Sequence, residues 1–362
     1  MTEDIYLKLG ERLNKNFMRL PLGEPVLNFL KKAFSPEQAE IAAGLPMGAH
    51  PLEHLAGVLN RDPDELYAIF DRMADRGLIF IHRDEAGVNH YSLPPFFPGI
   101  VEFQTMRGTE NPEDVEMART VKAMMDYLDE VGRELFKNPE VANRVLPAGL
   151  RTLTVEQEIP ADATVMPFEQ VSAIISQESS FGVVCCHCRH QAKLTGHPCR
   201  VENVPERTCF YFGRVADFMI ERGFARRVTK EECLDILKRC EAAGLVHNIN
   251  NYLGRSLVLC NCCSCCCDFL VRMKKYRGLQ SVARSNFMAS VDPETCTGCG
   301  ACVSRCQMEA LTLVDDVVSL TEIYCIGCGN CASVCPSGAL KMVRHADVKP
   351  VELTFEFPGL GL

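Results

Sequence analysis

A pattern of four cysteines occurs twice near the end of this chain, and the two copies are 29 positions apart. The copies are Cys296-x2-Cys299-x2-Cys302-x3-Cys306 and Cys325-x2-Cys328-x2-Cys331-x3-Cys335-Pro336. Three thiolates on one tight loop can reach three irons of a cubane iron–sulfur cluster, and the fourth iron must be bound by a cysteine from elsewhere. Glycines stand at matching positions in both copies, where they let the backbone approach the sulfides closely. The spacing therefore predicts two cubane clusters.

This segment resembles the bacterial ferredoxins that hold two [4Fe–4S] clusters. In those proteins the fourth cysteine of each run binds the cluster of the other run. The resemblance implies two ligand sets, which are Cys296, Cys299, Cys302 and Cys335 for one cluster and Cys325, Cys328, Cys331 and Cys306 for the other. Gln307 departs from the family, which usually has a proline where the second copy has Pro336. This departure removes no ligand.

The chain has 362 residues and 21 cysteines. Its length predicts several domains. In a short secreted protein so many cysteines would indicate disulfides. The start of the sequence shows neither an apolar signal core nor a cleavage site, and no stretch is apolar for long enough to span a membrane. We therefore expect a cytoplasmic protein without a membrane span, in which reduced thiols are available to iron.

Charge divides the chain into three parts. Residues 1–179 contain 17 Lys and Arg against 29 Asp and Glu, and residues 291–362 contain 4 against 9. The part between them, residues 180–290, is basic, with 17 against 9. A basic part between acidic parts indicates separate domains, and positive charge suits a region that holds further anionic clusters.

The patterns predict an α+β protein of several domains. The expected segments are an N-terminal helical segment (1–34), a winged-helix-like domain (35–95), a connector with an amphipathic helix (96–180), a cysteine-rich iron–sulfur domain (181–289), a ferredoxin domain with two [4Fe–4S] clusters (290–345) and a C-terminal tail (346–362). The connector's helix is expected from Pro112 to about Phe136, with its methionines in the core.

The winged-helix-like segment is bounded by capping signals at Ser35 and Asp62, and a hairpin follows the helix that ends near Arg76. Residues 36–92 contain ten acids against four arginines. Since phosphate contacts dominate nucleic-acid affinity, this charge disfavours DNA binding. We expect instead a structural role or docking to a protein, including formation of a homo-oligomer or a complex with a redox partner.

Thirteen cysteines lie between Cys185 and Cys267. Cys233 and Cys240 fall within a capped helix, residues 230–242, and are expected to be buried as small apolar side chains. The candidate ligands of one or two additional clusters are Cys186, Cys188, Cys199, Cys209, Cys260, Cys262, Cys263, Cys265, Cys266 and Cys267. A zinc site is the competing interpretation, with Cys185, Cys188, Cys199 and Cys209 as ligands and His187, His190 or His197 as substitutes.

The same region carries a second resemblance, over about 180–340. Its motifs are Cys-His-Cys-Arg-His at 186–190, Cys199, Cys209 and Cys-Asn-Cys-Cys-Ser-Cys-Cys-Cys at 260–267. They are similar to a largely uncharacterised family of ferredoxin-fused, cysteine-rich iron–sulfur proteins of anaerobic microbes. This resemblance implies further iron–sulfur clusters but names no substrate. Positive side chains beside the first motif, such as Arg189, are expected to compensate the charge of such clusters.

The function that these patterns favour is electron transfer, from a redox partner through several clusters to an oxidoreductase. No dinucleotide or phosphate-binding loop motif is present in the sequence. Two alternatives stay open. The chain is a reductase if a middle cluster is catalytic, and it is a redox-responsive regulator if a cluster controls the winged-helix-like domain.

Overall fold

The N-terminal region of the computed structural model is helical with one small sheet; the structure describes residues 2–16, 19–146, 148–254 and 256–351. Its helices are α1 (Thr2–Leu13), α2 (Glu24–Ala33), α3 (Pro36–Gly44), α4 (Leu52–Leu59) and α5 (Pro63–Asp75). The strands β1 (His50–Pro51), β2 (Phe80–Arg83) and β3 (Asn89–Ser92) pair antiparallel in the order β1-β3-β2. This is the order of helices and hairpin that the sequence predicts for residues 35–95, and the winged-helix assignment itself stays a prediction.

The predicted capping signals form hydrogen bonds at these helix starts. Ser35 and Gln38 cap α3 reciprocally, and the Asp62 carboxylate accepts bonds from the first two N–H groups of α5 beyond Pro63. Such caps satisfy N–H groups that have no partner within the helix. The local sequence therefore fixes where these helices begin.

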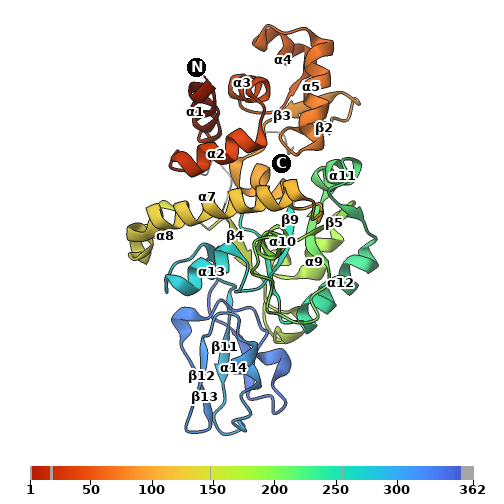
Figure 1. Cartoon of the computed structure of the whole chain (residues 1–362). Coiled ribbons are helices and arrows are strands. Elements are labelled where there is room, and N and C mark those ends of the chain that lie inside the picture. Colours follow the sequence, from red (N-terminus) through yellow and green to blue (C-terminus); the bar gives the residue numbers. More distant parts are fainter. Residues whose placement is uncertain (1, 17–18, 147, 255, 352–362) are drawn as a thin grey trace.

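A long helix crosses the molecule below this region (Figure 1). It is preceded by the turn η1 (Phe96–Ile100) and α6 (Val101–Phe103) and followed by α8 (Pro139–Val145). The helix itself, α7 (Pro112–Phe136), has the bounds that the sequence predicts, and Met117 and Met124 are buried in it. The methionine side chains of α7 thus pack in the core, as expected.

The middle region is built on a seven-stranded sheet with the order β10-β4-β8-β9-β6-β5-β7. All its pairs are antiparallel except β10 with β4. The strands are β4 (Leu150–Thr152), β5 (Phe181–Cys185), β6 (Arg207–Phe212), β7 (Arg226–Arg227), β8 (Val246–Asn250), β9 (Val258–Cys262) and β10 (Val282–Ala283). The sequence interpretation placed residues 150–152 in the connector, but these residues pair with β8 inside this sheet.

Helices surround this sheet and link its strands. They are α9 (Val171–Ser176), α10 (His187–Leu194), α11 (Gly213–Glu221), α12 (Lys230–Ala242) and α13 (Asp268–Lys275), with short turns η2 (Glu156–Glu158) and η3 (Pro167–Glu169). The helix α10 follows β5 with Cys186 at its N-cap, and α13 follows β9 after the turn 263–267, with Cys267 at its N-cap. Two cysteine-rich strand-to-helix turns therefore lie at the sheet.

The C-terminal region is small and contains two antiparallel sheets of two strands each. In one sheet β11 (Phe287–Val291) pairs with β14 (Leu340–Arg344), and in the other β12 (Leu311–Val314) pairs with β13 (Val317–Leu320). Short helical segments lie between them, namely α14 (Ala301–Arg305), η4 (Glu322–Tyr324) and η5 (Ala332–Val334). This region lies at the opposite end of the molecule from α1 (Figure 1). The mixture of helices and strands in the described chain fits the predicted α+β class.

The N-terminal region is anchored to the middle region through α5. Arg222, just after α11, forms ion pairs with Asp71 at 2.7 Å and Asp75 at 2.9 Å. Phe80 of β2 packs against Phe218 of α11, with ring centroids 4.6 Å apart. The acidic side of α5 therefore faces a neighbouring part of the same chain. Among the described helices, none combines the length and apolar character needed to cross a bilayer.

Candidate metal centres

Four cysteines of the C-terminal region surround one cavity. It is lined by Cys296, Cys299, Cys302 and Cys335. The first three belong to the first run, whereas Cys335 is the last cysteine of the second run. Backbone N–H groups of Leu340 and Ala339 donate to the Cys335 sulfur and, together with Ser337, lower its pKa against the opposing effect of burial.

A second cavity is lined by the other four cysteines, Cys306, Cys325, Cys328 and Cys331. Gly327 has a φ of +75°, and a Cβ there would collide with the Phe287 carbonyl oxygen. Each quartet thus combines three thiols of one run with the fourth thiol of the other. The cavities, the crossed quartets and the N–H donors fit two [4Fe–4S] clusters, which supply reversible one-electron transfer when bound.

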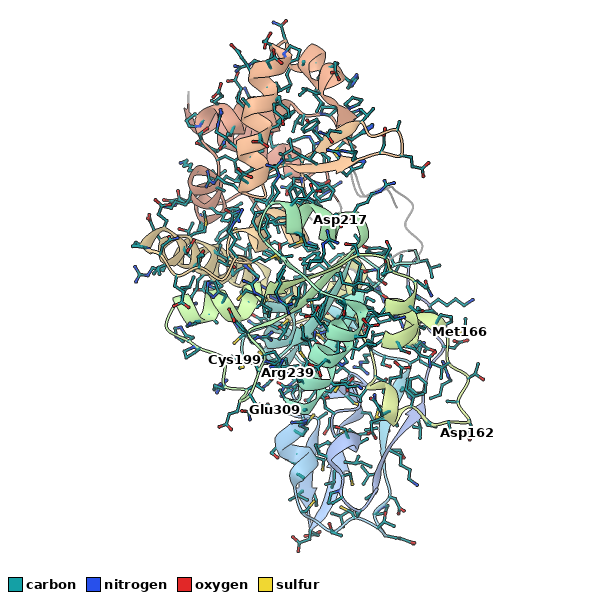
Figure 2. All side chains as sticks on the ribbon, turned by 90° about the vertical axis from the view of Figure 1, so that its right-hand side faces the viewer. Asp162, Met166, Cys199, Asp217, Arg239 and Glu309 are labelled. Atoms are coloured by element: carbon teal, nitrogen blue, oxygen red, sulfur yellow. The ribbon has the colours of Figure 1, made fainter. Side chains whose placement is uncertain are left out.

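The ten candidate cysteines of the middle region separate into two groups. The first contains four thiols, and all their sulfur atoms lie within 4.8 Å of one another: Cys199, Cys263, Cys265 and Cys266. Cys199, labelled in Figure 2, comes from the segment between α10 and β6, whereas the other three follow β9. Its sulfur lies 3.5 Å from that of Cys263 and 3.6 Å from that of Cys265. We call this group the thiol quartet.

The second group contains six buried or half-buried thiols, and each lies close enough to two others to shift their pKa values. Their order around the closed ring is Cys186, Cys188, Cys267, Cys262, Cys260 and Cys209. They come from the start of α10, from β6, from β9 and from the start of α13. We call this group the thiol ring.

Two thiols of the ring favour the thiolate form. Hydrogen bonds from Cys188 and Cys209 lower the pKa of Cys186, and hydrogen bonds from Cys188 and Cys262 lower the pKa of Cys267. Both residues stand at the N-cap position of their helix. A helix N-terminus favours a negatively charged sulfur, which is the form that binds a metal.

One arginine lies between the two groups. Burial disfavours the charge of Arg189, but the sulfurs of Cys186, Cys209 and Cys263 outweigh this effect and raise its pKa. Arg189 donates to the Asn261 carbonyl oxygen at 2.7 Å and also to Thr208. Its guanidinium is therefore a fixed positive charge that compensates thiolates of both the ring and the quartet, as the sequence interpretation expected.

Two titratable groups beside the ring, Glu102 and Asp268, were not identified from the sequence. Burial raises the pKa of Glu102 to about 8, and burial with the nearby Cys267 raises the pKa of Asp268 to about 7. Burial lowers the pKa of His187 to about 4, and its Nδ1 is hydrogen bonded to Thr105 Oγ1 at 2.6 Å. Glu102 and Thr105 are far from the cysteines in sequence, so no local pattern could have revealed them.

Three cysteines of the middle region belong to neither group. Cys233 and Cys240 are fully buried in α12, and burial raises the pKa of each thiol to about 12, in agreement with the predicted apolar role. Burial also raises the pKa of Cys185 to about 11. The four zinc ligands considered from the sequence do not come together in one site, because Cys188 and Cys209 lie in the ring while Cys199 lies in the quartet.

The ring is packed directly against the C-terminal region. Cys262 and Cys267 belong to one apolar cluster with Met308 and Ile326, and Cys306 and Cys328 of the second cavity pack against the same cluster. Polar contacts fix the two regions together. They are the bonds of Asn330 to the carbonyl oxygens of Gly244 and Leu245, of Gln307 to Gly244 and Ser264, and of Arg305 to Glu241 and Ala242. Gln307, which departs from the ferredoxin pattern, thus links the two regions.

Residues 288–336 match the family model of the 4Fe-4S dicluster domain. The match contains both cysteine runs and ends at Pro336. No curated protein matches the chain, and no solved structure does. The C-terminal part of the chain is therefore a ferredoxin-like iron–sulfur domain, and the many further cysteines support an iron–sulfur electron-transfer role.

Proposed function

We propose that the chain relays electrons between a redox protein and an oxidoreductase, through two C-terminal clusters and a third iron–sulfur centre held by the thiol ring. The observation that carries this proposal is the apolar cluster shared by ring cysteines and by ligands of the second C-terminal cluster. This shared cluster supports an arrangement in which the three centres follow one another in a row. The cluster ligands are proposed to be the two crossed quartets that line the C-terminal cavities.

The outer end of this row is the first C-terminal quartet. Cys299 is exposed, whereas the ring cysteines are buried or half-buried. An exposed ligand is the natural point of contact for a redox partner, and the ring is protected from solvent. The first C-terminal cluster is therefore the proposed point of exchange with that partner. All 21 cysteines are free thiols, which favours a reducing compartment such as the cytoplasm.

The experiment is a measurement of iron and acid-labile sulfide in the anaerobically purified chain, combined with a redox titration followed by EPR. We expect about twelve irons per chain, since each cubane has four. The double variant Cys262→Ser/Cys267→Ser should lose the iron of the third centre and keep both C-terminal signals. Cys240→Ala is the matched control, because this buried thiol belongs to neither group. A wild-type chain with about eight irons would contradict the proposal.

A second function, that of a reductase, is supported by the number of thiols in the ring. Six thiols exceed the four that one cubane takes, and Glu102 and Asp268 lie nearby with raised pKa values, as proton donors would. The discriminating measurement is the EPR spectrum of the reduced protein after addition of small disulfides, thiols or acyl-thioesters. A shift of the third signal favours a reductase, whereas an unchanged signal favours the relay.

For the N-terminal region we propose a winged-helix-like domain with a structural role. Asp71 and Asp75 of α5 are paired with Arg222 of the middle region. A helix that reads DNA needs a free face and positive charge, and here that face is acidic and partly occupied. A regulator that binds DNA through α5 is therefore the less favoured function.

A further inference from the structure

We propose that the thiol quartet, Cys199, Cys263, Cys265 and Cys266, binds a single tetrahedral zinc ion and not an iron–sulfur cluster. The proposal is independent of the function proposed for the ring. It concerns a site whose four ligands come together only in the folded chain, because Cys199 is far from the other three in sequence.

The distances between the sulfur atoms carry this inference. A zinc–sulfur bond of about 2.3 Å places the sulfurs of a regular tetrahedron about 3.8 Å apart. In the quartet the distances are 3.5 Å from Cys199 to Cys263, 3.6 Å from Cys199 to Cys265 and 3.8 Å from Cys265 to Cys266. The remaining distances stay within 4.8 Å. The spacing therefore matches four ligands on one ion.

The C-terminal quartets provide an internal comparison. There the four thiols of each set line a cavity between them, as a body of four irons and four sulfides requires. In the thiol quartet the sulfurs are already in contact with one another. A cubane would have to push these thiols apart, whereas a single ion fits between them without moving the chain.

Backbone donors support thiolates at this site. The N–H group of Val201 donates to the Cys199 sulfur, and the N–H group of Arg200 donates to the Cys265 sulfur. Hydrogen bonds of this kind orient metal ligands and offset their negative charge. A site with four thiolates and no open position is typical of structural zinc.

The position of the quartet indicates what the ion stabilises. Residues 195–206 contain no helix or strand, and Cys199 joins this segment to the turn that carries Cys263, Cys265 and Cys266. That turn lies between Cys262 and Cys267 of the thiol ring. An ion here would hold the segment 195–206 in place and fix the turn from which the ring cysteines extend.

The test is the zinc and iron content of the full chain, purified anaerobically from cells supplied with both metals. We expect one zinc per chain in the wild type. In Cys199→Ala we expect that zinc to be lost while the iron content and the EPR signals of the C-terminal clusters are unchanged. Cys240→Ala is the control and should keep the zinc. Loss of iron instead of zinc in Cys199→Ala, or a wild-type chain without zinc, overturns the proposal.

Two measurements keep the proposal testable if Cys199→Ala folds poorly. X-ray absorption at the zinc edge of the wild type should show four sulfur neighbours at about 2.3 Å, and nitrogen or oxygen neighbours would contradict the assignment. Limited trypsin digestion should cut after Arg200 faster in Cys265→Ala than in wild type, because the segment 195–206 loses its anchor. Equal rates would exclude the proposed role. Absence of iron from the thiol ring would contradict the proposed electron relay, but it would not bear on whether the thiol quartet binds zinc.

Discussion

The C-terminal and middle regions both bring cysteines together, but they do so in different ways. In the C-terminal region each set combines three cysteines of one short run with one from its repeat, and both sets line cavities. In the middle region the thiols extend from two strand-to-helix turns, β6 and an irregular segment, and the sulfurs of the thiol quartet are in mutual contact. The comparison shows that a repeated loop can encode a site locally, whereas a sheet assembles one from distant segments.

The two regions also differ in how they compensate thiolate charge. Backbone N–H groups near glycine-rich loops donate to the C-terminal sulfurs, as at Cys335. In the middle region a half-buried guanidinium, that of Arg189, lies among sulfurs of both groups. Backbone donors follow from the loop conformation, while this arginine must be positioned by tertiary packing.

The largest expected effect concerns the crossed ligands of the C-terminal region. Cys335→Ala should remove about four irons, those of the cluster beside Cys296, and leave the cluster beside Cys325 intact. Cys306→Ala should do the reverse. EPR of the reduced variants, with iron analysis, distinguishes the two centres. If each variant instead loses the cluster of its own run, the crossed assignment is wrong and the cavities do not mark the ligand sets.

An intermediate effect is expected where the two regions meet. Asn330 is buried, and Asn330→Leu would leave the carbonyl oxygens of Gly244 and Leu245 without this donor. Loss of such bonds costs about 1–3 kcal/mol. We expect a lower midpoint of thermal unfolding in anaerobic protein and a slower transfer of electrons to the third centre.

The matched control is a substitution at an exposed residue of the same interface. Glu309 pairs with Arg277 at 3.0 Å, and its side chain is 60% exposed. Glu309→Gln should therefore change the free energy of unfolding by less than about 1 kcal/mol. Equal effects of Asn330→Leu and Glu309→Gln would show that the buried amide does not hold the regions together.

The smallest effect is expected at the contact between α5 and the middle region. Arg222→Ala removes ion pairs with two partly exposed aspartates and should cost about 0–1 kcal/mol, less at high salt. Neither wild type nor variant should bind duplex DNA specifically in a gel shift. Specific binding that weakens when Arg72 and Arg76 are substituted would reassign α5 as a DNA-reading helix.

The local features of this protein could be predicted from neighbouring residues. The caps at Ser35 and Asp62, the bounds of α7 and the burial of Cys233 and Cys240 agree with prediction, because each depends on neighbouring residues. The same holds for the C-terminal iron–sulfur domain, where ligand spacing and glycine positions lie within one repeat. These signals act over a few residues and need no knowledge of the fold.

The division of the middle cysteines depends on the tertiary structure. Neighbouring cysteines separate, since Cys262 joins the ring and Cys263 joins the quartet. The strand β9 ends at Cys262 and the chain turns there, so the partners of each following thiol depend on which segments pack against that turn. The positions of Glu102 and Arg189, and the link made by Gln307, likewise follow from long-range packing that spacing along the chain does not encode.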